Sequence, residues 1–444
     1  MNWTQLISDK RFGLEDYHDP HSGVRSDFQR DFDRLVFSSP FRRLQNKTQV
    51  FPLPGSIFVH NRLTHSMEVS SVGRSMANEI SLLLRQRHTE PEICQKLESI
   101  GEIVGAACLA HDLGNPPFGH SGEKAISAFF SEGEGRVLQN ELTATQWTDL
   151  THFEGNANSL RLLTHQFRGR RRGGFAMTYS MLASIVKYPY ESALAGEKSK
   201  FGFFTTELDT FGRIADELGL ERRFTADGRM RYARHPLVYI VEAADDICYQ
   251  VMDIEDAHKL KILSTDEVMD VFMRFFPQER QAQMQGTMTH VDDPNERIAY
   301  MRSCVIGTLV QHCAQTFADN EQQLLAGTFE GTLVDNLPKP EREAYAGCSR
   351  LAWAKIYRAE EVVNVELAGN RIITFILEKL IHAVRFPELN YSRLLLSQIP
   401  QQYDTDAPTL FEKIQAVLDH ISGMTDVYAL NLYRKLYGMS LPAV

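Results

Sequence analysis

The stretch that decides the fold is LAHDLGNPPFGHSGE, residues 109–123, where an apolar run meets a His-Asp pair and then a turn built from Gly, Asn and Pro. Gly and Pro end helices, so we expect the apolar run to be a helix that stops at Gly114. Beyond the turn come a second histidine, His120, and an acidic residue, Glu123. Four ionisable groups around one helix end are hard to explain by packing alone, and they indicate a functional site.

Two histidines fall on apolar helix faces. His111 shares its face, at spacings of three and four, with Ile100, Ile103, Val104, Ala107 and Cys108. In the segment RLTHSMEVSSVGRSM, His65 is in step with Val69, Val72 and Met76. Both imidazole rings are therefore predicted to point into the core.

A third segment, LVYIVEAADDICYQVMDIEDA, carries acidic groups on an apolar face. Asp245, Tyr249 and Asp253 are four residues apart and share a face with Val238, Val241 and Met252. Burying an unpaired carboxylate is costly, so such groups need cations, hydrogen bonds or a metal. Inward histidines and aspartates satisfy one another through a divalent ion. The plainer alternative stays open here, since a lone histidine on an apolar face is usually a hydrogen-bonded core residue.

The overall composition favours a soluble, all-α protein. Of 444 residues, 43% are hydrophobic and 23% charged, and helical periodicity dominates with almost no strand alternation. The six cysteines have no CxxC spacing, which argues against disulfides and a thiolate zinc site. No apolar run approaches the ~18 residues of a membrane span and no signal pattern is present, so we expect a cytoplasmic protein. The polar, turn-rich stretch 320–345 suggests a helical domain in residues 1–320 and a C-terminal helical subdomain in residues 321–444.

These features together resemble the bacterial dGTP triphosphohydrolases of the HD-domain superfamily. The matching blocks follow in the order of that family, at residues 27–55, 61–70, 110–123, 152–157 (HFEGNA), 187–190 (KYPY) and 242–257. The clearest later block is YRAEEVVNVELAGNRII, residues 357–373. The resemblance implies an all-α fold with an HD-domain helical core.

Carried over position by position, the resemblance also implies which residues form the site. The implied metal ligands are His65, His111, Asp112 and Asp245. The implied catalytic pair is His120, near the scissile phosphate, and Glu123, which orients it.

Five further positions match those that contact the nucleotide in the family. Gln49 falls where the base edge is read, and Arg62 where the α-phosphate is held. Lys187, in KYPY, is implied as a phosphate contact. Tyr249 is implied to pack under the deoxyribose, and Asp253 to accept a hydrogen bond from its 3'-hydroxyl.

The implied activity is metal-dependent hydrolysis of dGTP, and of other dNTPs, at the α-phosphate, which yields a deoxynucleoside and tripolyphosphate. The implied cofactor is one divalent ion per site, Mg2+, Mn2+ or a similar transition metal, and the implied assembly is a homo-oligomer, a tetramer or hexamer. A dNTP is a polyanion and the chain has a net charge of -10, so the pocket must gather cations. Those available are Arg43, Arg62, Arg161, Lys187 and the run 168–172.

Two other functions are weighed against this one. Another HD-type phosphohydrolase, a 5'-nucleotidase or a phosphodiesterase, would share the metal site, but the blocks around Gln49 and Tyr249 argue against it. The other is a catalytically silent nucleotide- or single-stranded-DNA-binding regulator, against which the presence of every residue of the implied site argues. The chain departs from the family at Asn158, where Gln is common, and in the basic loop RGRRRGG, residues 168–174. That loop is either a solvated turn or a contact for phosphates of the substrate, an allosteric nucleotide or single-stranded DNA.

Overall fold

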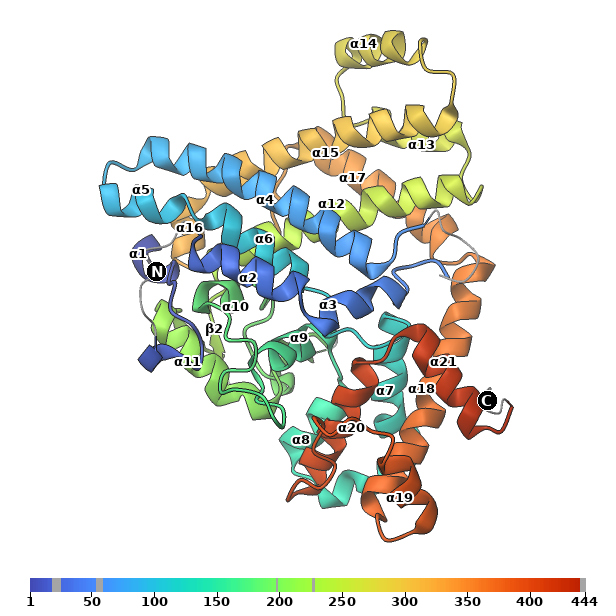
Figure 1. Cartoon of the computed structure of the whole chain (residues 1–444). Helices are drawn as coiled ribbons and strands as arrows, with labels where there is room; N and C mark the ends of the chain where they lie inside the picture. Colours follow the sequence, from blue (N-terminus) through green and yellow to red (C-terminus); the bar gives the residue numbers. More distant parts are fainter. Residues whose placement is uncertain (18–24, 53–58, 197–198, 226–227, 440–444) are drawn as a thin grey trace.

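A computed structural model describes residues 1–17, 25–52, 59–196, 199–225 and 228–439 of the chain (Figure 1). The helices of its first part are α1 (Trp3–Leu6), α2 (Asp27–Val36), α3 (Ser39–Arg43), α4 (Arg62–Arg87), α5 (Pro91–Leu97), α6 (Ile100–Ala110), α7 (His120–Ser131), α8 (Ala144–Thr151), α9 (Gly155–Thr164), α10 (Tyr179–Ser184), α11 (Leu208–Leu218) and α12 (Pro236–Lys259). Those of its second part are α13 (Thr265–Met273), α14 (Gln278–Met288), α15 (Pro294–Asp319), α16 (Glu321–Leu325), α17 (Lys339–Leu351), α18 (Glu360–Arg385), α19 (Asn390–Leu396), α20 (Leu410–Ser422) and α21 (Asp426–Leu436). A short π-helical segment, residues Ala352–Ile356, separates α17 from α18.

Four helices form the bundle that holds the site. The long helices α4, α12 and α15 pack against one another, and α6 packs against α4 and α12 (Figure 1). Every residue of α6 except Glu102 is buried, which is the pattern of a helix enclosed on all sides. Because α6 is central, the His-Asp pair at its end lies inside the protein.

The two long helices that face α6 begin with strong caps. The Asn61 side chain accepts the N–H of Thr64, and Thr64 returns a hydrogen bond to the main chain of Asn61, so α4 starts from a capping box. The His235 side chain accepts the N–H of Leu237, and Pro236 occupies the first position of α12. These caps fix where each helix starts, and therefore the position of His65 and Asp245 along the bundle.

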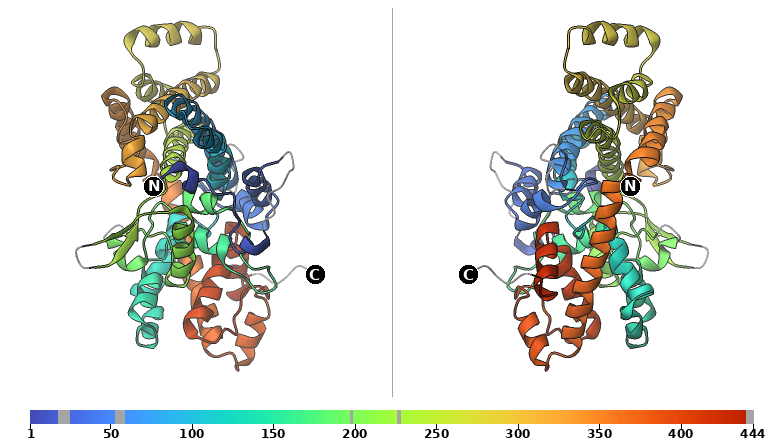
Figure 2. Two further views of the ribbon diagram at one scale, coloured as in Figure 1. Left: turned by 90° about the vertical axis from the view of Figure 1, so that its left-hand side faces the viewer. Right: turned by 90° about the vertical axis from the view of Figure 1, so that its right-hand side faces the viewer.

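A second apolar cluster combines segments that are far apart in the sequence. It contains α7, α8, α18, α20 and buried residues of the loop around Phe201 and Phe204. Figure 2 shows α18 between α7 and α8 on one side and α20 and α21 on the other. The C-terminal helices thus share a core with residues 125–204, and the boundary predicted at residue 320 stays a prediction.

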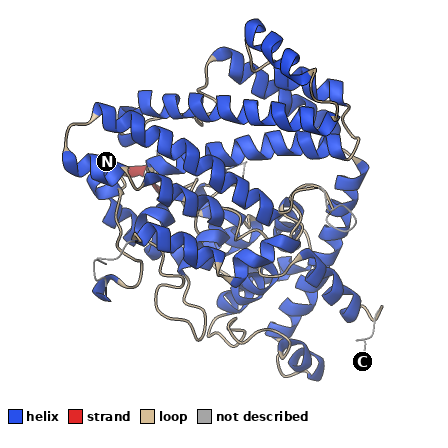
Figure 3. Ribbon diagram, turned by 45° about the horizontal axis from the view of Figure 1, so that its top comes forward, coloured by secondary structure: helices blue, strands red, loops and turns tan. Residues whose placement is uncertain are grey.

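Helices make up nearly all the regular structure of the described residues (Figure 3). Their one sheet is a hairpin of two short antiparallel strands, β1 (Arg222–Phe224) and β2 (Met230–Tyr232). The predicted all-α fold is confirmed. None of the described helices is both long enough and apolar enough to cross a bilayer. Residues 53–55, which end the first matching block, lie outside the described residues.

Candidate metal centre and active site

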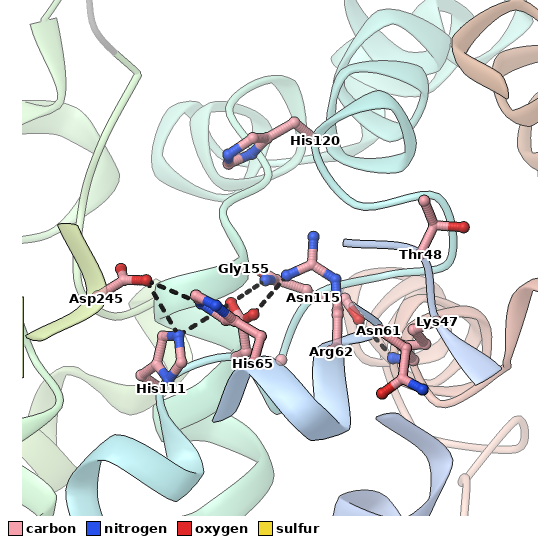
Figure 4. Close-up of polar contacts among 12 residues, drawn as sticks. Lys47, Thr48, Asn61, Arg62, His65, His111, Asn115, His120, Gly155 and Asp245 are labelled. Atoms are coloured by element: carbon pink, nitrogen blue, oxygen red, sulfur yellow. Dashed lines mark hydrogen bonds and ion pairs between the residues drawn. The ribbon is translucent and has the colours of Figure 1, made fainter. Parts of the chain in front are cut away.

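Three side chains from three helices meet at one point in the bundle. His65 lies in the first turn of α4, His111 directly follows α6, and Asp245 lies within α12. The Nε2 atoms of His65 and His111 are 3.2 Å and 3.4 Å from the same atom, Oδ1 of Asp245 (Figure 4). One ligand-type atom from each residue lies within 4.8 Å of the other two. Two imidazole nitrogens and a carboxylate oxygen are a donor set that suits a divalent transition metal.

His111 has a buried nitrogen that lacks a hydrogen-bond partner. Its Nδ1 donates to the carbonyl oxygen of Cys108 at 2.6 Å, so Nε2 is a bare acceptor. Nε2 is buried and makes no hydrogen bond within the described structure, although it faces the carboxylates of Asp112 and Asp245. Burial lowers the pKa of His111, but these two carboxylates outweigh burial and raise it. The surroundings favour a cation on Nε2, so the residues present fit a metal ion.

Asp112 is held beside this cluster by two partners of its own. Arg62 Nη1 donates to Oδ2 at 2.6 Å, and the side-chain amide of Asn115 donates to Oδ1 at 2.5 Å. Burial would raise the pKa of Asp112, but Arg62 and His111 lower it well below its usual range. Asp112 is therefore an ionised carboxylate next to His111, with its orientation set by Arg62.

The second oxygen of Asp245 is paired with a lysine. Lys187 Nζ lies 2.7 Å from Oδ2 of Asp245. Burial opposes both charges, yet the pair raises the pKa of Lys187, and Lys187 together with the histidines lowers that of Asp245. The structure thus places Lys187 against the cluster of His65, His111 and Asp245, which we call the metal-type cluster. A contact between Lys187 and a phosphate stays a prediction.

His120 and Glu123 form a second group beyond the turn. His120 Nδ1 lies 2.7 Å from Oε2 of Glu123, and the other Glu123 oxygen accepts the N–H of Gly155 at 2.8 Å. The side chain of His120 is 64% exposed, whereas that of Glu123 is 9% exposed. Its hydrogen bond with Glu123 raises the pKa of His120. A buried carboxylate thus orients an accessible histidine, which is an arrangement suited to proton transfer.

Arg62 connects the two groups through a glycine. Gly119 precedes His120 with φ of 58°, where side chains are strained. A Cβ atom at Gly119 would lie 2.5 Å from Arg62 Nη2. The guanidinium therefore contacts Asp112 with one nitrogen and reaches the residue before His120 with the other.

The predicted base and sugar contacts lie on two segments that also carry or contact residues of these groups. The carbonyl of Lys47 accepts the N–H of Arg62, so Gln49 belongs to the segment that runs next to the start of α4. The Oε1 atom of Gln49 is buried without a hydrogen-bond partner in the described structure. Tyr249 and Asp253 follow Asp245 by one and two turns of α12 and share its face. The structure thus places Tyr249 and Asp253 on the helix that carries Asp245, and Gln49 two residues beyond the contact between Lys47 and Arg62; the roles of all three stay predictions.

Family models match two parts of the chain. One described as HD domain covers residues 62–172, from the start of α4 into the basic loop, and one described as phosphohydrolase-associated domain covers residues 336–435. A deoxyguanosinetriphosphate triphosphohydrolase-like protein of Pseudomonas aeruginosa is 36% identical over 460 residues, with 100% of both chains covered. This chain belongs to the deoxyguanosinetriphosphate triphosphohydrolase-like family.

Other members of the family match along the whole length as well. The Synechocystis protein of the same name is 35% identical over 456 residues, covering 99% of this chain and 100% of the relative. The deoxyguanosinetriphosphate triphosphohydrolase of Yersinia enterocolitica is 28% identical over 518 residues, covering 98% of this chain and 99% of the relative. The chain is thus a hydrolase of the HD type, whose members depend on metal ions.

Sequence reasoning missed several residues that support the site in this family member. Lys47 is buried, and its ammonium donates to the carbonyl oxygens of Asn115 at 2.5 Å and Ser422 at 2.7 Å. Tyr357 donates to Asp253. The only signal in the sequence was that Lys47, Asn115 and Tyr357 lie within the matching blocks.

The expectation for Arg161 is wrong. Its guanidinium is buried and contacts both oxygens of Asp419, at 2.9 and 2.8 Å, and Glu207 at 2.7 Å. These acids neutralise the charge, so Arg161 is not available to a phosphate. In the basic loop of this hydrolase, Arg168 and Arg171 are exposed and Arg170 lies over the ring of Phe175 at 5.0 Å. A phosphate contact by this loop stays a prediction.

Proposed function

We propose that this chain hydrolyses deoxynucleoside triphosphates, dGTP among them, at the α-phosphate to a deoxynucleoside and tripolyphosphate. The observation that carries the proposal is the meeting of His65, His111 and Asp245 next to an accessible His120 with a buried carboxylate partner. The names of the full-length relatives support dGTP as a substrate of this chain.

In the proposed enzyme, His65, His111, Asp112 and Asp245 hold one divalent ion, Mg2+, Mn2+ or a similar transition metal. Such an ion supplies a Lewis acid for the phosphoryl oxygens and lowers the pKa of a water molecule. The chain keeps the carboxylates in place by pairing Asp112 with Arg62 and Asp245 with Lys187. Fixed charges of this kind need no reorganisation during the reaction.

The residues around the cluster then orient the substrate and move a proton. Arg62 holds the α-phosphate with the part of its guanidinium that faces Gly119. His120 donates a proton to the leaving 5'-oxygen of the deoxynucleoside, since Glu123 raises its pKa and thereby favours the protonated ring. The hydrogen bond from Gly155 keeps Glu123 in position for this.

The nucleoside is recognised by residues of two segments. Gln49 reads the base edge with an amide whose oxygen lacks a protein partner among the described residues. Tyr249 packs against C2' of the sugar, where the hydroxyl of a ribose would clash. Asp253 accepts a hydrogen bond from the 3'-hydroxyl.

Three further proposals concern the protein as a whole. We expect a cytoplasmic homo-oligomer, a tetramer or hexamer. We also expect an allosteric nucleotide or single-stranded DNA as the partner of the basic loop, residues 168–174, because arginine side chains bind phosphate through paired hydrogen bonds.

The test is a screen of the four dNTPs, alone and in pairs, with Mg2+, Mn2+ or Co2+, in which the phosphate product is identified. Tripolyphosphate together with a deoxynucleoside supports the proposal. Orthophosphate or pyrophosphate as the first product would contradict it and favour another HD-type phosphohydrolase. Asp245→Ala is the control that excludes a contaminating hydrolase, because it must abolish the release.

A further inference from the structure

The carboxyl group of Asp253 is only half satisfied by the protein. Asp253 is 4% exposed, and its Oδ2 accepts the hydroxyl of Tyr357 at 2.8 Å. Its Oδ1 has no hydrogen-bond partner among the described residues. Burial raises the pKa of Asp253 to about 8 even with the hydrogen bond from Tyr357, so a further donor is needed to favour the ionised form. A buried carboxyl group that is short of donors is a place where a ligand hydroxyl gains a hydrogen bond.

Tyr357 reaches this position from a distant part of the chain. It follows the π-helical segment Ala352–Ile356, and such segments are frequent at functional sites. Its ring stacks on that of Tyr249, with centroids 6.0 Å apart and planes 24° apart. The ring of Trp353 lies edge-on to that of Tyr357, with centroids 6.3 Å apart. The phenol is therefore held in place on Asp253 by two aromatic neighbours.

We propose that Tyr357 determines sugar specificity: its hydroxyl holds Oδ2 of Asp253, which presents Oδ1 to the 3'-hydroxyl of a deoxynucleoside. The inference rests on the proposed function, in which Asp253 receives that hydroxyl. Tyr357 lies inside the phosphohydrolase-associated match, residues 336–435. In this proposal that region therefore adds a residue to a site whose other residues come from the HD-domain match and from α12.

The physical reason is that two donors on one carboxylate help each other. Each hydrogen bond stabilises the ionised form, and the ionised form is the stronger acceptor for the other. Loss of the Tyr357 hydroxyl leaves both oxygens without a protein donor and free to rotate away from the sugar. We therefore expect its loss to weaken a ligand that has a 3'-hydroxyl by about tenfold, the scale of a hydrogen bond to a charged group.

The test compares two ligands on three proteins by calorimetry. The ligands are the deoxynucleoside that binds best among the four and its 2',3'-dideoxy analogue. The proteins are the wild type, Tyr357→Phe and the matched control Tyr345→Phe, which removes another phenol bonded to α12, at the main-chain oxygen of Asp246. We expect Tyr357→Phe to weaken the deoxynucleoside about tenfold and the dideoxy analogue less than twofold. Tyr345→Phe should leave the ratio of the two affinities unchanged.

Several outcomes would overturn the inference. An equal loss for both ligands would mean that Tyr357 acts only on structure, and no loss for either would mean that it does not act on the sugar. A gain that is specific to the 3'-hydroxyl ligand would mean that the phenol occupies the place of the sugar. A wild type that binds both ligands equally would exclude Asp253 as the 3'-hydroxyl acceptor.

Hydrolysis assays on the same proteins separate this inference from the proposed function. If the wild type releases no tripolyphosphate from any dNTP but its affinity depends on the 3'-hydroxyl through Tyr357, the proposed function fails and the inference stands. If it releases tripolyphosphate while Tyr357→Phe changes both ligands equally, the inference alone fails.

Discussion

The interaction between His120 and Glu123 gives the sharpest test of the proposed mechanism. In the wild type, the N–H of Gly155 donates to Oε1 of Glu123 at 2.8 Å. In Glu123→Gln the side-chain carbonyl oxygen can still accept this hydrogen bond. What is lost is the charge on Oε2, 2.7 Å from Nδ1 of His120. The variant thus removes an electrostatic interaction while it keeps the shape of the side chain.

The expected magnitude follows from the kind of bond that is lost. A hydrogen bond to a charged group contributes about 1.5–3 kcal/mol, and each ~1.4 kcal/mol in the barrier is a factor of ten in rate. We therefore expect kcat/KM to fall by roughly ten- to hundredfold. Because Glu123 raises the pKa of His120, the ionisation of His120 should also move to lower pH in the rate profile.

The assay measures tripolyphosphate release across a range of about pH 5.5 to 9, with the metal content of each preparation determined by elemental analysis. Since Glu123 is outside the metal-type cluster, we expect full metal content in Glu123→Gln. A variant that keeps more than half of the wild-type kcat/KM, or whose profile moves to higher pH, would refute the role given to Glu123.

Three other predictions follow from the same geometry. His120→Ala should keep its metal and lower turnover by about 10² or more, and a turnover near that of the wild type would show that His120 is not the acid. Asp245→Ala should lose the metal, because it removes the carboxylate that faces both His65 and His111; stoichiometric metal in the purified variant would exclude this assignment. The third prediction concerns the cap of α12, where burial lowers the pKa of His235 to about 4 from 6.5. The unfolded chain takes up the proton between these values and the folded chain does not, so stability is lost as pH falls from 6.5 toward 4, by up to about 3 kcal/mol. His235→Asn keeps an acceptor for Leu237 without titrating, so its unfolding midpoint should depend less on pH in this range; equal slopes for both proteins would contradict the reasoning.

The helical fold and the inward direction of two histidine side chains could be predicted because they depend on periodicity alone. His65 and His111 lie on apolar stripes, and both are buried in the bundle. The register of Asp245, Tyr249 and Asp253 on one helix follows from their spacing of four. Each of these inferences uses only residues that are close together in the sequence.

Contacts between segments could not be predicted in the same way. Lys187 was expected at a phosphate, and its partner is Asp245, 58 residues further along the chain. Arg161 was expected in the pocket, but Asp419 and Glu207 surround it. A sequence shows which side chains are cationic, but only the folded structure shows which acidic side chains pair with them.

Hydrogen bonds connect the C-terminal helices α20 and α21 to the turn between α6 and α7, which follows the His-Asp pair. The ammonium of Lys47 is enclosed between the carbonyls of Asn115, in the turn, and Ser422, at the end of α20. Asp426 accepts the N–H groups of Thr48 and Phe118, and so bonds both the segment before Gln49 and the turn before His120. A buried ammonium with one acceptor removed is costly, and burial already lowers the pKa of Lys47 to about 7. The C-terminal helices therefore hold both the turn that follows the His-Asp pair and the segment before Gln49 in place.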